Sequence, residues 1–354
     1  MSAAGWMVYG ATGFTGELIV AEAVRRGMTP IVAGRSEDKV KALAARHGLE
    51  WRAFVVDDPA ALASGLRGVG LVLHCAGPFF RTYQQVLAGC LAAGAHYLDI
   101  TGEIAVFEGC ARRDADARAA GIVVLPGVGF DVVPSDCLAA SLKAALPTAT
   151  SLELAFGGGA GLSRGTARTM VAGLGMGGAI RQGGKIRTVP LAHAVLTVPY
   201  RDKPRLSVSI PWGDVSTSYH STGIGDIVVY RAAPPGQVRG MKVMRWLGPL
   251  LGSSLVQRWL TARIDAGAAG PDESRRGRSP MQLWGRVRDG ATSVEGTLVT
   301  PEGYDLTALA AVECVRRLLS GGVKPGYRTP SLAFGREFVA TIPGCDLRIG
   351  PRRP

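Results

Sequence analysis

Six short apolar segments alternate with helix-like segments along the first third of the chain, and this alternation constrains the fold more than any other feature. The apolar segments are Trp6–Tyr9, Ile31–Ala33, Phe54–Val56, Leu71–Leu73, Tyr97–Ile100 and Ile122–Leu125. Apolar residues recur at helical spacing in the intervals, with Ser36 and Asp58 placed as N-caps and Pro59 at a first helical position. Strands that alternate with helices in this way pair in parallel. The sequence therefore predicts an α/β fold with a doubly wound parallel sheet.

The pattern changes after Pro126 and becomes typical of an α+β domain. Further strand-like segments are Ser151–Phe156, Leu196–Val198, Leu206–Ile210, Ile227–Tyr230, Gln282–Arg288 and Thr292–Leu298. They predict a largely antiparallel sheet, with one helix over Arg164–Ile180 and a last one over Leu306–Leu319. We expect a nucleotide-binding domain at 1–130, an α+β substrate or dimerisation domain at 131–300, and a helix and tail at 301–354 that return to the first domain.

Composition narrows the class of protein. The 354 residues are 47% hydrophobic, enough for a sizeable core, and no run of 18 apolar residues suits a transmembrane helix. The N-terminus lacks the charged region of a signal peptide, so we expect a cytoplasmic protein. The six cysteines and five histidines show no metal-ligand spacing, and no metal site is expected.

The net charge of +12 raises the question of an anionic partner. The basic residues are scattered and are not interleaved with aromatic residues, a pattern that does not favour nucleic acid. Anionic small molecules, such as phosphorylated cofactors and carrier thioesters, account for the sign of the charge at least as well.

A glycine-rich turn lies between the first predicted strand and the first helix. It comprises Gly10, Ala11, Thr12, Gly13, Phe14, Thr15 and Gly16. Glycines here allow a sharp turn and let backbone amides approach a pyrophosphate at the helix N-terminus. The spacing is GxxGxxG and not the usual GxGxxG, so the prediction of a dinucleotide site rests on its position after a strand and before a helix.

The end of the second predicted strand indicates which dinucleotide binds. NAD sites usually place a carboxylate there, whereas this chain has Arg35 followed by Ser36. A guanidinium and a hydroxyl suit a 2′-phosphate, so NADP is predicted. Asp57, after the third strand, is expected either to accept from the adenine amine or to cap a helix.

Two further loops follow strands at the same edge of the predicted sheet. Ala76, Gly77 and Pro78 form a small-residue loop against which a ribose and nicotinamide can lie. Asp99, Thr101, Gly102 and Glu103 either line the nicotinamide pocket or hold loops in place by hydrogen bonds. We expect the active site where these loops face the second domain.

These motifs together resemble a known family. The segments YGATGFTG, AGR, AGPF, HYLDITGE and PGVGFDVVPSD are similar to the saccharopine dehydrogenase-like NADP-binding family, and most similar to its trans-acting enoyl reductase branch. The likeness continues at SRGT (163–166), at YHSTG (219–223) and at later glycine-containing motifs. It implies a Rossmann domain followed by an α+β domain, NADPH as cofactor, and reduction of an enoyl thioester that is bound to a carrier protein.

Tyr219 and His220 are the candidate catalytic residues of the second domain. Reduction of an enoyl group needs stabilisation of the enolate oxygen and a proton for the α-carbon, and a phenol or an imidazole can supply either. We expect both residues to lie on a strand. Neighbouring side chains of a strand point to opposite faces, so only one of the two would face the cofactor. Tyr219 is preferred because a phenol stays protonated at neutral pH. The alternative is a packed tyrosine beside a surface histidine.

The segment Met241–Ile264 is both basic and apolar, and Gly248–Pro249 divides it into two predicted helices. It suits peripheral contact with a membrane or with acyl chains, or else a helical cover or a homodimer seam.

Three functions follow from the sequence. The first is an NADPH-dependent reductase of a C=C bond in an acyl or polyketide thioester. The second is an oxidoreductase of C=N bonds, as in saccharopine-forming relatives. The third is a non-catalytic, lipid-associated NADP-binding protein, because a fold alone does not determine function.

Overall fold

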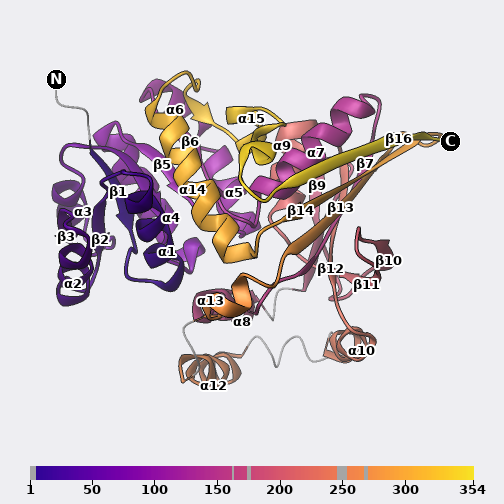
Figure 1. Ribbon diagram of the computed structural model, residues 1–354, viewed down its shortest axis with the longest axis horizontal. Helices are drawn as coiled ribbons and strands as arrows, with labels where there is room; N and C mark the ends of the chain where they lie inside the picture. Colours follow the sequence, from indigo (N-terminus) through magenta and orange to yellow (C-terminus); the bar gives the residue numbers. More distant parts are fainter. Residues whose placement is uncertain (1–4, 162, 174–176, 245–252, 267–269) are drawn as a thin grey trace. The chain divides into compact units, whose positions relative to one another are not determined.

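The computed structural model describes residues 5–161, 163–173, 177–244, 253–266 and 270–354 (Figure 1). Its first sheet has seven parallel strands in the order β15-β6-β5-β4-β1-β2-β3. In chain order these are β1 (Gly5–Tyr9), β2 (Ile31–Gly34), β3 (Trp51–Ala53), β4 (Val69–His74), β5 (His96–Asp99), β6 (Val123–Leu125) and β15 (Gly326–Tyr327). The predicted doubly wound parallel sheet is confirmed.

Helices cover both faces of this sheet. They are α1 (Phe14–Arg25), α2 (Glu37–His47), α3 (Pro59–Gly65), α4 (Phe79–Ala93), α5 (Ile104–Ala111), α6 (Asp114–Ala119), α14 (Gly303–Leu319) and α15 (Pro330–Phe334). The core between strands and helices includes Met7, Val72, Tyr97 and Val124, each at most 1% exposed. Burial on both faces explains why the strands read as continuous apolar runs in the sequence.

Two local predictions need correction. The third strand lies at Trp51–Ala53 and not at Phe54–Val56, because the latter apolar run forms a loop whose Phe54 and Val56 are buried. Asp58 caps α3 as expected, accepting from the amides of Ala60 and Ala61, but Ser36 occupies the N-cap of α2 without a side-chain capping bond. The helical interval between the fifth and sixth predicted strands contains two helices, α5 and α6.

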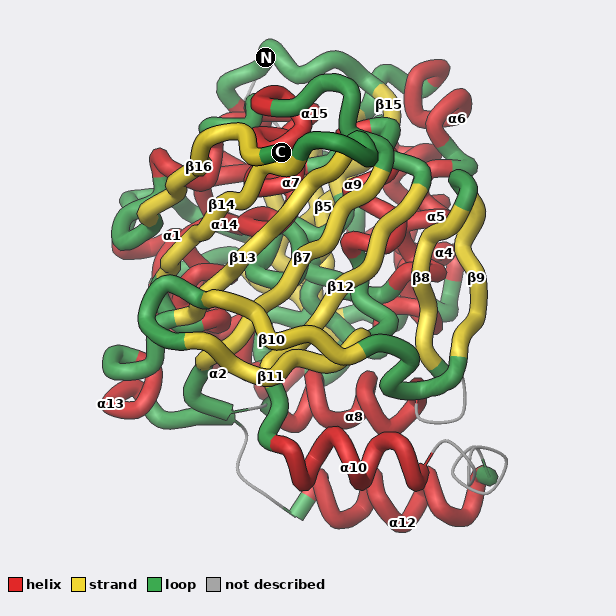
Figure 2. The backbone as a smooth tube through the Cα atoms, turned by 90° about the vertical axis from the view of Figure 1, so that its right-hand side faces the viewer, coloured by secondary structure: helices red, strands yellow, loops and turns green. Residues whose placement is uncertain are grey.

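The second sheet is mixed (Figure 2). Its main path is β10-β11-β12-β7-β13-β14-β16, and β8 and β9 join it through β12. The strands are β7 (Ser151–Gly158), β8 (Gly178–Gln182), β9 (Lys185–Val189), β10 (Val195–Pro199), β11 (Pro204–Ser209), β12 (Asp226–Ala232), β13 (Met281–Arg288), β14 (Ser293–Thr300) and β16 (Asp346–Arg353). Only the pairing of β7 with β12 is parallel among the described pairs, so the expected largely antiparallel sheet is present.

Helices also accompany the second sheet. They are α7 (Val133–Ala145), α8 (Arg164–Gly173), α9 (Asp214–Thr222), α10 (Pro235–Met244), α12 (Ser254–Asp265), α13 (Glu273–Arg276) and the 3-10 helix η2 (Phe338–Thr341). The helix predicted over Arg164–Ile180 ends earlier, because a strand begins at Gly178 directly after Gly177, whose φ is +75°. Helix α7 packs where Gly285 and Gly296 pair across β13 and β14. A Cβ at Gly285 would lie 2.7 Å from the Leu142 side chain, so glycine allows this close approach.

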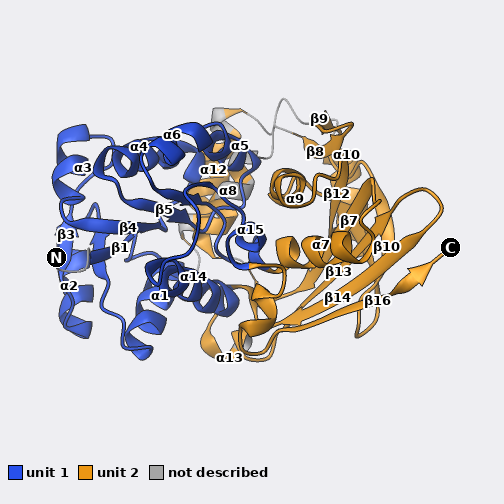
Figure 3. Ribbon diagram, turned by 90° about the horizontal axis from the view of Figure 1, so that it is seen from above, with its two compact units in different colours: residues 1–133, 304–334 blue, residues 134–303, 335–354 orange. Residues whose placement is uncertain are grey.

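The chain divides into two compact units, each made of two separate stretches (Figure 3). The first unit comprises 1–133 and 304–334, and the second comprises 134–303 and 335–354. Helix α14 thus belongs to the first unit, as expected of the last long helix. The tail does not, because β16 pairs with β14 of the second sheet. The prediction that the whole of 301–354 returns to the first domain is corrected in this respect.

Candidate functional site

The turn after β1 is held by backbone contacts with two neighbouring loops. The amides of Gly10 and Ala11 both donate to the carbonyl of Ala33, at 2.8 and 3.1 Å, and so tie the turn to β2. Gly10 has a φ of +84°, and a Cβ on it would lie 2.7 Å from the backbone nitrogen of Ala76. The turn therefore packs directly against the loop that follows β4, and Gly10 must be glycine for that reason.

The other two glycines of the turn differ in their surroundings. A Cβ on Gly16 would overlap the carbonyl oxygen of Gly10, whereas a Cβ on Gly13 would meet only that oxygen, at 3.4 Å. Gly13 is exposed and is the N-cap residue of α1, so no side chain at this position caps the first-turn amides. Such a helix start presents backbone amides and a positive dipole end to an anion. The turn thus fits a pyrophosphate, and the dinucleotide expected from the sequence suits it.

The remaining members of the turn support it. Ala11 is fully buried, and Thr12 and Thr15 are partly buried. The Phe14 ring packs edge-on against Tyr304 of α14, with ring centroids 5.1 Å apart. Phe14 therefore anchors the start of α1 to the C-terminal helix of the first unit.

Two opposite charges lie near the hydroxyl of Tyr9, next to the turn. Burial raises the pKa of Tyr9, while the positive charge of Arg35 lowers it and the negative charge of Asp57 raises it. Arg35 is exposed, and Ser36 follows it at the start of α2. Asp57 accepts from the Gln85 amide at 3.4 Å and does not cap α3, a role that Asp58 fills. Arg35 and Asp57 therefore both lie within electrostatic range of the Tyr9 hydroxyl, in the segments that follow β2 and β3.

The loop of Ala76, Gly77 and Pro78 is fixed by α4. The hydroxyl of Thr82 donates to the carbonyl of Ala76 at 3.0 Å, and the peptide bond between Gly77 and Pro78 is cis. The carboxylate of Glu103 accepts from the amides of Phe79 and Phe80, at 2.9 and 2.8 Å. Glu103 therefore closes the N-terminus of α4, in contrast to the glycine start of α1.

Asp99 is fully buried and links the backbone segments that follow β5 and β6. It accepts from the Tyr97 hydroxyl at 2.7 Å, from the Thr101 amide at 3.0 Å and from the Gly127 amide at 2.8 Å. Burial raises its pKa to about 6, although these hydrogen bonds act in the opposite direction. Of the two roles expected for the 99–103 segment, loop positioning accounts for these contacts of Asp99 and for those of Glu103.

Asp131 is an acidic residue at the same sheet edge that the sequence analysis did not single out. A Cβ on Gly102 would lie 2.6 Å from an Asp131 carboxylate oxygen, so this carboxylate lies directly against the backbone after β5. Burial raises the pKa of Asp131 to about 7, and the charge of Glu103 acts in the same direction. The sequence does indicate Asp131 as a candidate, because it follows the sixth strand in the motif PGVGFDVVPSD. Ligand-binding loops of parallel sheets follow the carboxyl ends of the strands.

Tyr219 and His220 lie on helix α9 and not on the expected strand. Serines and threonines dominate this helix, which ends at Gly223 in a left-handed C-cap. Most of them are buried, and this tertiary packing outweighs their local preference for a strand. The guanidinium of Arg181 lies 4.2 Å from the centre of the Tyr219 ring and donates to the carbonyls of Val215 and Gly184. Adjacent helical residues differ by about 100° around the axis, so Tyr219 and His220 do not point to opposite faces as they would on a strand.

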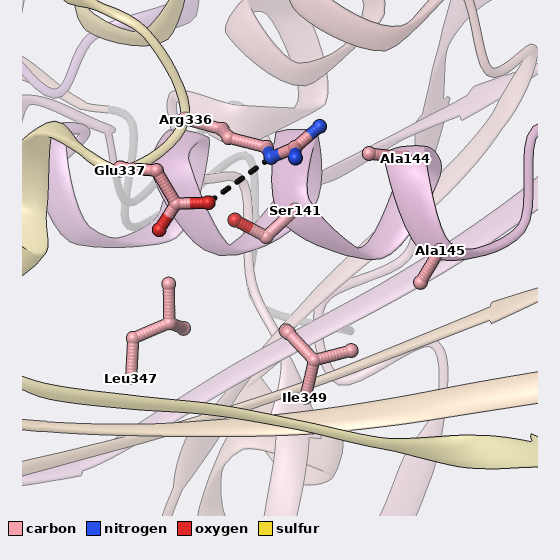
Figure 4. A pocket seen from close by; sticks show the side chains of 7 residues that line it. All are labelled: Ser141, Ala144, Ala145, Arg336, Glu337, Leu347 and Ile349. Carbon is pink, nitrogen blue, oxygen red and sulfur yellow. Dashed lines mark hydrogen bonds and ion pairs between the residues drawn. The ribbon is translucent and has the colours of Figure 1, made fainter.

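Other features lie apart from these predicted residues. A cavity of about 300 Å³ lies between α7, residues 336–337 and β16, and none of its lining residues is a predicted site residue (Figure 4). It is lined by Ser141, Ala144, Ala145, Arg336, Glu337, Leu347 and Ile349. Within the described residues, no cluster of three or more His, Cys, Asp or Glu side chains could hold a metal. No described helix is long and apolar enough to cross a bilayer.

Sequence relatives match little more than a third of the chain. A trans-acting enoyl reductase of Mycobacterium leprae is 32% identical over 142 residues, which cover 37% of this chain and 33% of that protein. A saccharopine dehydrogenase-like oxidoreductase of Homo sapiens is 29% identical over 150 residues, covering 37% of this chain and 35% of the relative. The match thus spans about a third of the length of these curated relatives.

A solved structure matches the whole chain. The saccharopine dehydrogenase (L-Glu forming) of Saccharomyces cerevisiae, in its apo form, aligns with 99% of this chain and 100% of its own length, at a TM-score of 0.65 and 15% identity. At this identity the likeness shows the fold, a parallel Rossmann sheet with a second mixed-sheet domain.

The family model supplies the last comparison. Residues 6–125 match the model described as the saccharopine dehydrogenase NADP binding domain, over β1 to β6 and the helices between them. The match confirms NADP as the expected cofactor. Over these residues, about a third of its length, the chain is similar to saccharopine dehydrogenase NADP-binding domains.

Proposed function

We propose that this protein is an NADPH-dependent oxidoreductase that reduces a C=C bond of an acyl or polyketide thioester. The observation that carries the NADPH requirement is the pairing of an open glycine turn with an exposed arginine at the end of β2. Gly13 is unobstructed by protein atoms other than the Gly10 carbonyl, and Arg35 stands where a carboxylate would select NAD.

The chain's own residues have distinct roles in this proposal. The amides of the Gly10–Gly16 turn bind the pyrophosphate, and Arg35 with Ser36 binds the 2′-phosphate. Asp57 accepts from the adenine amine, and the loop of Ala76, Gly77 and Pro78 supports the ribose and nicotinamide. The cofactor, when bound, supplies a hydride to the substrate. Tyr219 donates a proton or a hydrogen bond to the developing enolate, and His220 is the alternative donor.

The enoyl thioester is favoured by the sequence relatives. Among them are proteins named trans-acting enoyl reductase, 30–32% identical to this chain over 142 residues. A carrier-bound thioester is also anionic, which suits a chain of net charge +12.

A second candidate is reduction of a C=N bond. It is favoured by the fold likeness of the whole chain to a saccharopine dehydrogenase. An amino-acid substrate of that kind carries carboxylates and would need arginines to hold them.

A substrate panel tests both candidates. Purified protein is mixed with NADPH and, separately, with enoyl thioesters of several chain lengths, with imines formed from amino acids, and with ketones. We expect NADPH oxidation with an enoyl thioester, with deuterium from labelled NADPH at the β-carbon, and none with the Gly13→Val variant. Oxidation with imines alone would replace the first candidate by the second, and no oxidation with any substrate, despite tight NADPH binding, would contradict both.

A further inference from the structure

Two helices of the second unit lie at the same edge of that unit. Helices α10 and α12 both lie along the lower edge in Figures 1 and 2, apart from each other in Figure 1, where α8 lies above α12. Both belong to the second unit, although 245–252 separate them in sequence.

Helix α10 buries one apolar side chain against the unit, and helix α12 contacts a neighbouring helix. On α10, Val238 is 5% exposed, and it packs with Met241 in a small cluster that includes Val208. Helix α12 packs against α8. The apolar residue that remains exposed near the end of α10 is therefore not needed to attach that helix.

The exposed side of both helices combines large apolar residues with basic ones. Val243 on α10 is 63% exposed and Trp259 on α12 is 58% exposed, the two highest values among the large hydrophobic residues described. Exposed basic residues flank them, namely Arg239, Lys242, Arg258 and Arg263. The Arg263 guanidinium lies 4.9 Å from the centre of the Trp259 ring, so the indole and the charge occupy one patch.

The charge of these two helices is predominantly positive. Helix α10 contains no Asp or Glu, and α12 contains only Asp265, its last residue. A tryptophan and a valine among arginines and a lysine suit the boundary of an anionic bilayer, where indole rings and basic side chains are both favoured. Because the two helices lie apart along this edge, a flat partner could reach both, whereas a small partner would reach one. These features favour a lipid surface over a small globular partner.

We propose that Arg239, Lys242, Val243, Arg258, Trp259 and Arg263 form a face that docks this protein onto an anionic lipid bilayer. The proposal does not depend on the reaction catalysed. If the substrate carries a long acyl chain, docking would bring the protein to the phase in which such chains accumulate.

Vesicle co-sedimentation of the full chain tests the proposal. One set of vesicles contains phosphatidylcholine alone, and the other contains phosphatidylcholine with about a third phosphatidylserine. We expect strong partitioning onto the second set, little onto the first, and a loss of binding as the salt concentration rises. Equal binding to both sets, or no binding to either, would overturn the proposal.

Matched variants separate this face from the general positive charge of the chain. Arg258→Gln with Arg263→Gln should lower partitioning about 25-fold, at about fivefold for each charge near the surface. The control, Arg288→Gln with Arg353→Gln, removes the same charge from exposed positions of β13 and β16. Equal losses for both pairs would mean diffuse attraction and would overturn the proposal.

A second pair tests the apolar contribution. Trp259→Ala should lower partitioning by about tenfold, through lost burial of the indole. Leu332→Ala, at a residue that is 48% exposed on α15, should leave it unchanged. If vesicle binding is absent and the Arg258/Arg263 variant instead loses capture by an acidic carrier protein, the face belongs to a protein partner and the proposal fails.

Discussion

The three glycines of the first turn are glycine for three different reasons. Gly10 makes room for the loop after β4, and Gly16 makes room for the carbonyl of Gly10. Gly13 meets no comparable obstruction within the protein, because the only atom near its missing Cβ is 3.4 Å away. Packing explains Gly10 and Gly16, whereas the pyrophosphate of the proposed cofactor site would explain Gly13.

This difference leads to a prediction for Gly13→Val. The side chain would stand where the pyrophosphate approaches the backbone, so NADPH binding should be abolished while the Tm stays within a few degrees of the wild type. Gly16→Val is the matched control and should lower the Tm, because its Cβ overlaps the turn. Fluorescence titration and thermal unfolding measure both effects. Normal NADPH affinity in Gly13→Val would show that the turn does not bind the phosphates.

Arg35 gives a second prediction at the scale of single residues. Arg35→Ala should weaken NADPH binding by about 1–3 kcal/mol, through loss of charge-assisted hydrogen bonds to the 2′-phosphate. NADH binding should hardly change, because NADH lacks that phosphate. Lys39→Ala, at an exposed residue of α2, controls for the loss of a nearby charge. Equal affinities of the wild type for NADPH and NADH, by titration, would refute the role of Arg35.

Tyr219 gives a third prediction, which applies once a substrate is accepted. Tyr219→Phe removes the hydroxyl but keeps the ring on which Arg181 stacks, so the fold of α9 should be unchanged. Turnover should fall by about 10²–10⁴-fold, the usual contribution of general acid catalysis, with NADPH affinity intact. His220→Ala should have a smaller effect. Wild-type turnover in Tyr219→Phe would leave solvent as the proton source.

At the scale of elements, buried carboxylates hold together the loops at the carboxyl edge of the first sheet. Asp99 joins the loops after β5 and β6, and Glu103 joins the loop after β5 to the start of α4. The elements are therefore connected where the cofactor binds in folds of this type. A protonation change at Asp99 should affect the stability of that edge.

The expected pH dependence follows from the raised pKa of Asp99. Its pKa moves from 3.8 to about 6 in the folded chain, so between these values the native state holds a proton that the unfolded chain has released. This contribution to stability is complete below about pH 4 and is lost as the pH rises through about 6. Urea unfolding across this range should show a smaller decline in Asp99→Asn, whose amide does not titrate. If the free energy of unfolding of Asp99→Asn declined with pH as steeply as that of the wild type, Asp99 would be excluded as the source of the decline.

The sequence predicts the central elements of the fold better than those at its margins. Strands β1, β4, β5 and β6 were recognisable because they are buried on both faces and are continuously apolar. The two-residue strand β15 is too short for any periodicity, and β3 was displaced onto Phe54–Val56 because a buried loop has the same composition as a strand. Helix α9 was misjudged because its serines and threonines have no strong helical preference and are fixed by burial.

The candidate site shows the same division. The turn and Arg35 were predictable because their backbone conformation and charge depend on residues that are adjacent in sequence. The contact between Gly102 and Asp131 joins two separate loops, and no local pattern reports it.

At the scale of the whole molecule, the predicted cofactor-binding residues all fall within the first unit. A ligand that binds only the native state stabilises it by mass action, by about 2.7 kcal/mol at 100 times its Kd. In scanning calorimetry, NADPH should therefore raise the transition of the first unit more than that of the second. NADH at the same concentration serves as the control. An NADPH shift confined to the second unit's transition would contradict the assignment of the cofactor to the first unit.

The interleaving of the two units also determines when each can be completed during synthesis. The ribosome makes β1 to β6 first, but α14 and β15 of the same unit follow about 170 residues later, after most of the second unit. Until then the amides and carbonyls along the free edge of β6 lack the strand that pairs with them in the finished protein. A nascent chain stalled before residue 304 therefore exposes an unpaired strand edge. Chaperones can bind such an edge, and two such chains can pair through it.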